Sequence, residues 1–321
     1  MQLLAPAKVN LFLRIVGQRP DGYHLLDSLM SPISLYDDIT IAVQDGKNVK
    51  AGKDEKTGPP HASQISLSCD DPSIPSDETN LAYRAAALVC QEAQLTARIT
   101  LDITKRIPAG AGLGGGSSDA AAVLKGLNTA FGLGWTESRL CSLGAKLGAD
   151  VPFFIPCQTA HVSGIGEELS PVLLTLDRWL VLVVPSFGVS TPWAYRRFDE
   201  LGRKDSDGAC VSSIAGQNWR ADQNWPIPGD CVNDLESAVL PTYPAIQEIK
   251  DELLACQAEV ALMSGSGSAV FGVFPHQQAA QQAGEAVAKR GRVFVVQPLA
   301  RAPSGSSRAP SGSSRAVSDS T

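Results

Sequence analysis

Apolar and polar residues alternate near the start of the chain and predict a β-strand over residues 7–16. Successive side chains of a strand point to opposite faces, so one face of this strand is apolar and the other mainly polar. Lys8, Asn10 and Arg14 share the polar face with Phe12. The strand therefore presents a cation and an amide as neighbours on one face. The apolar face carries Val9, Leu11, Leu13 and Ile15.

The rest of the chain contains segments with the helical period of 3.6 residues and short alternating or continuously apolar segments. A turn is expected at Arg19–Gly22, and Thr136 is expected to cap a helix. Further strands are predicted over 39–43, 97–104, 172–185, 259–263 and 292–296. Helices are predicted over 80–93, 117–131, 136–148, 243–255 and 277–290.

Length and local composition predict two domains and a tail. A chain of 321 residues is long enough for two compact domains, and residues 157–175 have the character of a join. We therefore expect domains at 1–164 and 165–298. Residues 299–321 include a seven-residue segment that occurs twice, and its Ser, Gly, Pro and Arg residues cannot form a core. This end is expected to be disordered, and surface loops are expected at 44–64 and 203–230.

Composition limits the classes of partner. Lys and Arg number 27 against 33 Asp and Glu, a net charge of −6, so we expect no nucleic-acid partner and only a local phosphate site. The seven cysteines lack C-x-x-C spacing, which favours free thiols in a reducing compartment, and the four histidines indicate no zinc site. The longest strongly apolar run, Trp179–Pro185, is far shorter than the ~20 residues of a membrane span. A cytoplasmic protein with no membrane partner is expected.

A glycine-rich segment directly before a predicted helix is the most informative motif. Five glycines lie between Gly110 and Ser118, and an alanine-rich helix follows. Glycine lets the backbone approach an anion closely, and the first N–H groups of a helix attract negative charge. The segment therefore predicts a phosphate site formed by Pro108, Ala109, Gly110, Ala111, Gly112, Leu113, Gly114, Gly115, Gly116, Ser117 and Ser118.

Other glycine motifs explain this segment less well. A Walker loop requires a lysine before its Ser or Thr, and none stands between Gly116 and Ser117. Gly110, Gly112 and Gly115 match G-x-G-x-x-G, but the acidic residue that should follow about 20 residues later is missing. A flexible linker would not continue into an apolar helix.

Five motifs in chain order resemble the GHMP kinases, a family of small-molecule ATP-dependent kinases. They are Pro-Ala-Lys8-Val-Asn10-Leu, Asp-Gly-Tyr23-His24, the glycine loop, Gly-Ala-Asp150-Val-Pro and Ser264-Gly-Ser-Gly-Ser268. The resemblance covers about residues 3–298. It implies an α+β, two-domain GHMP kinase fold, with an N-terminal domain like ribosomal protein S5 domain 2 and a ferredoxin-like C-terminal domain. The active site is then expected in the cleft between the domains.

The resemblance implies phosphoryl transfer from ATP with Mg²⁺. Asp150 would accept the proton of the substrate hydroxyl, and Lys8 would keep that carboxylate ionised. The glycine loop would hold the phosphates of ATP, and Ser118 would be the candidate metal ligand. From the residues alone, the serines could simply cap the helix, Asp150 could belong to a turn, and Lys8 could be a solvated surface lysine.

The substrate that the resemblance implies is a cytidine-diphosphate polyol of the non-mevalonate route to isoprenoid precursors, phosphorylated on its 2-hydroxyl. Asn10 would bind this substrate, Tyr23 and Tyr195 would stack on the cytosine, and His24 would contact its edge. Trp193 competes with Tyr195 for this role, and any of the aromatic residues could instead belong to the core. Ser264–Ser268 could form an anion-binding nest or a tight turn.

Two alternatives remain open at this stage. The protein could be a mevalonate- or homoserine-type kinase of the same family, or a nucleotide sensor without catalysis. Lys8 and Asp150 disfavour the sensor, because a sensor needs no base beside a γ-phosphate. The expected assembly is a monomer or a homodimer.

Overall fold

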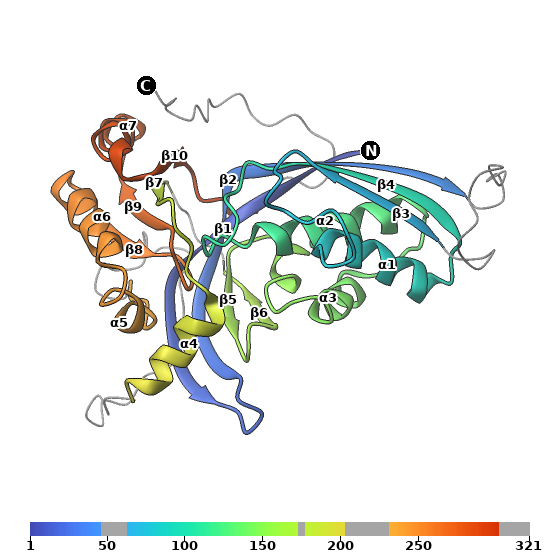
Figure 1. Cartoon of the computed structure of the whole chain (residues 1–321), viewed down its shortest axis with the longest axis horizontal. Coiled ribbons are helices and arrows are strands. Elements are labelled where there is room, and N and C mark those ends of the chain that lie inside the picture. Colours follow the sequence, from blue (N-terminus) through green and yellow to red (C-terminus); the bar gives the residue numbers. More distant parts are fainter. Residues whose placement is uncertain (46–62, 173–176, 203–230, 302–321) are drawn as a thin grey trace.

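The structure, a computed structural model, describes residues 1–45, 63–172, 177–202 and 231–301. These residues form an N-terminal lobe around a six-stranded sheet and a C-terminal lobe around a four-stranded sheet (Figure 1). Helices pack on both sheets, which confirms the predicted α+β class. Most of the loop expected at 44–64, the whole segment 203–230 and the end 302–321 lie outside the described residues.

A long antiparallel hairpin runs through the N-terminal lobe. β1 (Gln2–Gln18) pairs with β2 (His24–Asp45) over almost its whole length. The predicted strand at 7–16 is confirmed and is longer at both ends, whereas only residues 39–43 of the 22-residue β2 were predicted. The distal half of β2 also pairs with β4 (Ala97–Thr104), and its proximal part pairs with β5 (Ala160–Ser163).

The remaining strands extend the first sheet in the order β3-β4-β2-β5-β6. The β5–β6 hairpin occupies the region where the sequence suggested a join, so the expected boundary at residue 164 falls inside this sheet, which continues to Pro171. Helices cover one face of the sheet (Figure 1). The remaining strands and helices of this lobe are β3 (Gln64–Cys69), α1 (Leu81–Ala93), α2 (Gly115–Ala130), α3 (Glu137–Ala145), η2 (Pro152–Phe154), β5 (Ala160–Ser163) and β6 (Glu168–Pro171). Thr136 caps α3 as expected, accepting a hydrogen bond from Arg139 N–H.

The C-terminal lobe has an antiparallel sheet in the order β10-β7-β9-β8. Its helices α6 and α7 contact this sheet, whereas α4, which the sequence did not predict, lies beside the first hairpin (Figure 1). The elements are β7 (Trp179–Val184), α4 (Thr191–Glu200), α5 (Glu236–Val239), α6 (Pro244–Ala255), β8 (Val260–Met263), β9 (Val270–Phe274), α7 (Gln277–Ala286), η5 (Ala288–Arg290) and β10 (Arg292–Val296).

The first residues of the expected tail belong to the fold. Leu299 N–H donates to Pro32 O at 2.7 Å, and Thr159 N–H donates to Ala300 O at 3.1 Å. The chain after β10 therefore returns to the N-terminal sheet and is held there through Arg301, which bridges to Gln158. The expected disorder from residue 299 is wrong for these three residues, because backbone hydrogen bonds can order a segment that buries little apolar surface.

One apolar cluster joins the two lobes and determines where β1 lies. Val9 and Leu11 of β1 are fully buried and belong to the same cluster as Leu182 of β7 and Phe271 of β9. The prediction that Phe12 shares the face of Lys8 and Asn10 is wrong: Phe12 belongs to this cluster too, because the register shifts between Asn10 and Phe12. Lys8 and Asn10 instead line a cavity, so the strand contributes both to the interlobe core and to that cavity.

Candidate active site

A cavity of about 980 Å³ lies between the lobes and collects nearly all residues that the sequence motifs predicted for the site. Its walls come from β1, the start of β2, the glycine loop, the segment before η2, α4 and the loop after β8. This is the size range of small-molecule and cofactor sites. Of the site residues predicted from the sequence, the cavity is lined by Lys8, Asn10, Tyr23, His24, Pro108, Ala109, Gly110, Ala111, Gly112, Leu113, Gly114, Gly115, Gly116, Ser117, Asp150 and Tyr195, but not by Ser118.

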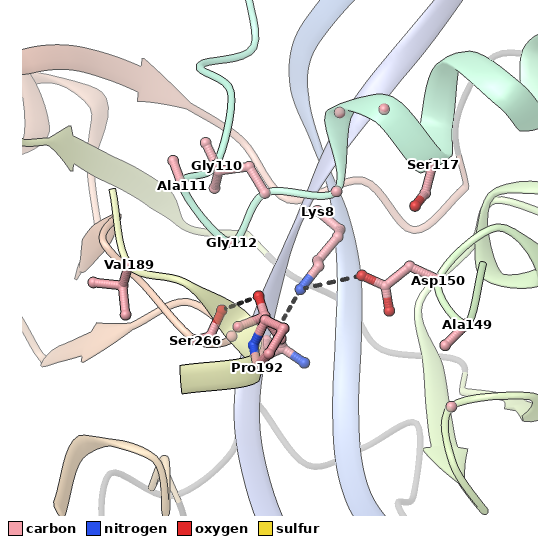
Figure 2. A pocket seen from close by; sticks show the side chains of 18 of the residues that line it. Lys8, Gly110, Ala111, Gly112, Ser117, Ala149, Asp150, Val189, Pro192 and Ser266 are labelled. Atoms are coloured by element: carbon pink, nitrogen blue, oxygen red, sulfur yellow. Dashed lines mark hydrogen bonds and ion pairs between the residues drawn. The ribbon is translucent and has the colours of Figure 1, made fainter. Parts of the chain in front are cut away.

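Lys8 points toward Asp150 in the cavity (Figure 2), and it also contacts Asn10. Lys8 Nζ donates to Asn10 Oδ1 at 2.5 Å and lies 4.0 Å from Asp150 Oδ2. Asn10 in turn donates to Ser28 Oγ, which donates to Phe12 O. The chain of hydrogen bonds fixes the amide, and the amide fixes the ammonium.

The two charged partners differ in their access to solvent. The Lys8 side chain is 5% exposed, whereas that of Asp150 is 38% exposed. Burial lowers the pKa of Lys8, and the carboxylate of Asp150 opposes part of this shift. Lys8 is therefore no solvated surface lysine. Asp150 does not cap η2, whose N-cap is Val151, so its carboxylate is available to the cavity.

The glycine loop bends through three left-handed residues into α2. Gly110, Gly112 and Gly114 all have positive φ, and Gly114 is the N-cap. The helix begins at Gly115, so neither serine caps it. The N–H groups of its first turn have no partner inside the helix, and they precede Ser118, the first to bond back to Gly114 O. The anion site expected from the sequence would therefore be formed by the backbone N–H groups at the start of α2, which we call the cradle.

The second glycine-rich motif locks against the first. Ala269 N–H donates to Ala111 O at 3.1 Å, and Ser264 Oγ donates to Gly112 O at the same distance. A methyl group on Gly112 would lie only 2.2 Å from Ser264 O, so no other residue fits. Within Ser264–Ser268 the chain turns through a Gly267 N–H bond to Ser264 O. This motif thus forms a tight turn that supports the glycine loop.

The two serines of the loop differ in their surroundings. Ser117 lines the cavity, whereas Ser118 is 1% exposed and its Oγ has no hydrogen-bond partner. A buried hydroxyl without a partner costs free energy unless a ligand or water satisfies it. The described ranges contain no group of three or more His, Cys, Asp or Glu side chains that could hold a metal ion.

A buried ion cluster lies beneath the start of α2. Lys105 Nζ donates to Asp37 Oδ2 at 2.5 Å and to Asp119 Oδ2 at 2.8 Å. Burial alone would lower the pKa of Lys105, but the two carboxylates outweigh it and raise that pKa. Burial also raises the pKa of Asp119. The Lys105 ammonium lies 3.3 Å from where a Cβ on Gly115 would be, and its charge is already balanced by the carboxyl groups that it contacts.

The far end of the cavity carries the aromatic residues. His24 Nε2 lies 2.7 Å from Asp199 Oδ1, and the His24 ring lies 4.8 Å from that of Tyr195. Tyr23 is 59% exposed at the rim and does not belong to the core. Burial, aided by the negative charge of Asp150, raises the pKa of Tyr195, so its hydroxyl remains a donor. Trp193 instead packs edge-on against Tyr243.

Sequence reasoning missed several cavity residues. Arg196 and Asp199 lie on α4, one and four positions after Tyr195. The residues of α4 have the helical period, but the helix is short and mostly polar, and it follows an extended residue, Ser190. The opposite end of the cavity is lined by Ile74, Pro75, Thr79, Asn80, Leu81, Lys105, Ile107 and Asp119. No local motif marks these residues, which the fold brings together.

Comparison with known proteins identifies relatives along the chain. Residues 80–157 match the family model for the GHMP kinases N terminal domain, and residues 192–293 match that for GHMP kinases C terminal. A 4-diphosphocytidyl-2-C-methyl-D-erythritol kinase of Geobacter sp. (strain M21) is 39% identical over 289 residues, covering 90% of this chain and 95% of the relative. One of the same name from Syntrophotalea carbinolica is 40% identical, covering 92% and 98%.

Solved structures agree with these relatives. A crystal structure of 4-(cytidine 5'-diphospho)-2C-methyl-D-erythritol kinase superposes with a TM-score of 0.70 at 34% identity, covering 93% of this chain and 99% of that one. A homoserine kinase from Cytophaga hutchinsonii shares the fold with a TM-score of 0.66 but only 18% identity. No helix in the described part of the chain has the length and apolar character needed to cross a membrane.

Proposed function

The chain belongs to the GHMP kinase family, and from this premise we propose that it transfers the γ-phosphoryl group of ATP to the 2-hydroxyl of 4-diphosphocytidyl-2-C-methyl-D-erythritol. The product is an intermediate of the non-mevalonate route to isoprenoid precursors. The observation that carries the proposal is the Lys8–Asp150 pair, 4.0 Å apart, between a phosphate cradle and an aromatic subsite.

The chemistry follows from the geometry of that pair. Phosphoryl transfer requires a positioned hydroxyl more than a strong base, because the transition state is loose. Asp150 would accept the hydroxyl proton. Lys8 would hold its charge beside that carboxylate and orient the reacting oxygen, while Asn10 keeps Lys8 in place. The free N–H groups at the start of α2 would bind the phosphates of ATP.

Mg²⁺ fits this site as a companion of the phosphates. It is a hard cation that usually takes one or two protein oxygens and keeps phosphate and water ligands. We propose that the unpartnered Oγ of Ser118 is the protein's oxygen ligand. When bound, the ion would neutralise charge on the transferred group.

The substrate would lie with its base at the aromatic end. Tyr23 and Tyr195 would flank the cytosine, with His24 at its edge. The diphosphate then falls beside Arg196, an exposed cation on the cavity wall for which no ion pair exists with the other described residues. Arginine binds phosphate oxygens in a bidentate way. Lys8 and Lys105 are already engaged with carboxylates.

The alternative acceptors within the family are mevalonate and homoserine, neither of which carries a base or a diphosphate. ATP-dependent phosphorylation of the three acceptors in parallel tests the assignment.

We further propose that the protein works in the cytoplasm, since the six cysteines in the described ranges are free, as in a reducing compartment. The assembly is proposed to be a monomer or a homodimer.

A further inference from the structure

A short segment ahead of α5 is attached to the strand that carries Lys8. Leu13 N–H donates to Val232 O at 2.8 Å, and Asp234 N–H donates to Leu13 O at 2.9 Å. Ile15 N–H donates to Asp234 Oδ2 at 2.8 Å. Residues 232–234 therefore follow the path of β1 and cannot move independently of it.

Asn233 in this segment also holds the loop after β8. Its side-chain amide donates to Met263 O at 2.8 Å and to Gly265 O at 2.7 Å, and its Oδ1 accepts from Leu235 N–H. The residue is 5% exposed. Both the amide nitrogen and the amide oxygen of its side chain bond to backbone groups, so one buried amide connects β1 with the turn at Ser264–Ser268.

The loop held by Asn233 packs directly on Lys8. A methyl group on Gly265 would lie 3.3 Å from Lys8 Nζ and 3.4 Å from Asn10 Oδ1. Gly265 therefore lies beside both the Lys8 ammonium and the Asn10 oxygen that accepts its hydrogen bond. On its other side the same position lies 3.4 Å from Gly112 O, part of the glycine loop.

We propose that Asn233 is a positioning residue for catalysis: through Gly265 it holds the wall that fixes Lys8 against Asn10 and Asp150. The proposal rests on the proposed role of Lys8 in phosphoryl transfer. Without the amide, two buried carbonyls lose their donors, the loop can shift, and water reaches Lys8. A displacement of about 1 Å at a reacting group can lower a rate about 100-fold.

The pH profile separates this role from a merely structural one. Asp150 is the charged group that faces Lys8 across the cavity, Asn10 and Gly265 are its neutral neighbours, and Tyr195 lies near Asp150. Burial lowers the pKa of Lys8, so kcat should decline as pH rises, at a pH below the usual pKa of lysine. This decline is the alkaline limb of the pH profile. Hydration after loss of Asn233 should move this alkaline limb to higher pH.

The experiment measures kcat, KM for ATP and the pH profile of N233A and N128A in the full-length protein. Asn128 is the matched control, because its amide also joins backbone groups, donating to Trp135 O and accepting from Trp135 N–H, but away from the cavity. N233A should lower kcat about 10- to 100-fold, leave KM for ATP within about twofold, and shift the alkaline limb upward. N128A should lower the melting temperature and leave the limb in place.

An unchanged kcat and limb in folded N233A would overturn the proposal, and so would a limb that moves equally in N128A. If N233A does not fold, N233S takes its place, because it keeps a side-chain oxygen for Leu235 N–H and removes both amide donors. Wild-type protein is first assayed on all three acceptors, and the variants use whichever one it phosphorylates. A wrong acceptor assignment therefore leaves the test of Asn233 intact.

Discussion

Lys8 Nζ lies 4.0 Å from Asp150 Oδ2, a contact between a buried ammonium and a partly exposed carboxylate. The first strand supplies one partner and the segment before η2 supplies the other. The carboxylate at this distance opposes part of the lowering of the Lys8 pKa that burial causes. The contact thus leaves a carboxylate open to substrate on one side and held by a cation on the other.

Replacing Asp150 with Asn should abolish most turnover. The amide keeps the size of the side chain but cannot take a proton from the hydroxyl, so kcat should fall about 10²- to 10⁴-fold. ATP should still bind with nearly the same affinity, because the cradle is formed by backbone groups of the glycine loop. Calorimetric titration with ATP and steady-state kinetics measure the two effects, and a D150N enzyme with near-normal kcat would remove Asp150 from this role.

The pH dependence of kcat should report the buried ammonium of Lys8. Burial lowers its pKa, so the charged form, and the activity that needs it, should be lost as pH rises through a value below the usual ~10.4. In K8R the guanidinium stays charged throughout, and the alkaline limb should disappear even if kcat is lower. Profiles recorded from about pH 6 to 10 decide this, since a limb common to both proteins would belong to another group.

Two glycines of the glycine loop should respond very differently to replacement by alanine. Both have positive φ, which costs about 1 kcal/mol for a residue with a Cβ. A Cβ on Gly110 meets nothing within 4 Å, whereas one on Gly112 would lie 2.2 Å from Ser264 O. G110A should lower the melting temperature slightly and keep a normal KM for ATP. G112A should raise KM for ATP at least about 10-fold, because the two loops must separate; similar kinetics in both variants would argue against the interlock.

Neighbouring arginines on α4 should separate diphosphate binding from surface charge. Arg196 lines the cavity, whereas Arg197 is paired with Glu200 at 2.9 Å. Loss of a charge-assisted hydrogen bond of about 1.5–3 kcal/mol should raise KM for the cytidine substrate about 10- to 100-fold in R196A, with KM for ATP unchanged. R197A should behave like the wild type, because exposed pairs contribute little. Equal KM values in the two variants would place the diphosphate elsewhere.

The placement of part of the candidate site was predictable from the sequence because short-range patterns encode it. Alternation in β1 predicted that Lys8 and Asn10 share a face, and their 2.5 Å contact confirms it. Glycines followed by an alanine-rich run predicted a loop and a helix, and α2 begins two residues before the predicted start. The distant Asp150 was found through its motif and the family resemblance, not through any pattern linking it to Lys8.

Other parts depend on contacts that the sequence does not display. β2 pairs with three strands along its length, so its burial changes from one partner to the next and hides a simple alternation. The β5–β6 hairpin was interpreted as a join because each of its strands has only four residues. Asn233 follows a segment without periodicity, and its importance depends on two carbonyls that lie far along the chain.

The most direct measurement is ATP-dependent phosphorylation by the purified wild-type protein of 4-diphosphocytidyl-2-C-methyl-D-erythritol, mevalonate and homoserine, assayed side by side with Mg²⁺. The cavity has an aromatic end with Tyr23, His24 and Tyr195 and a cation at Arg196, which only the first acceptor can use. We predict phosphorylation of that acceptor at its 2-hydroxyl, with kcat/KM at least about 100-fold above the other two. No turnover of the cytidine compound, or preferred turnover of mevalonate or homoserine, would contradict the account.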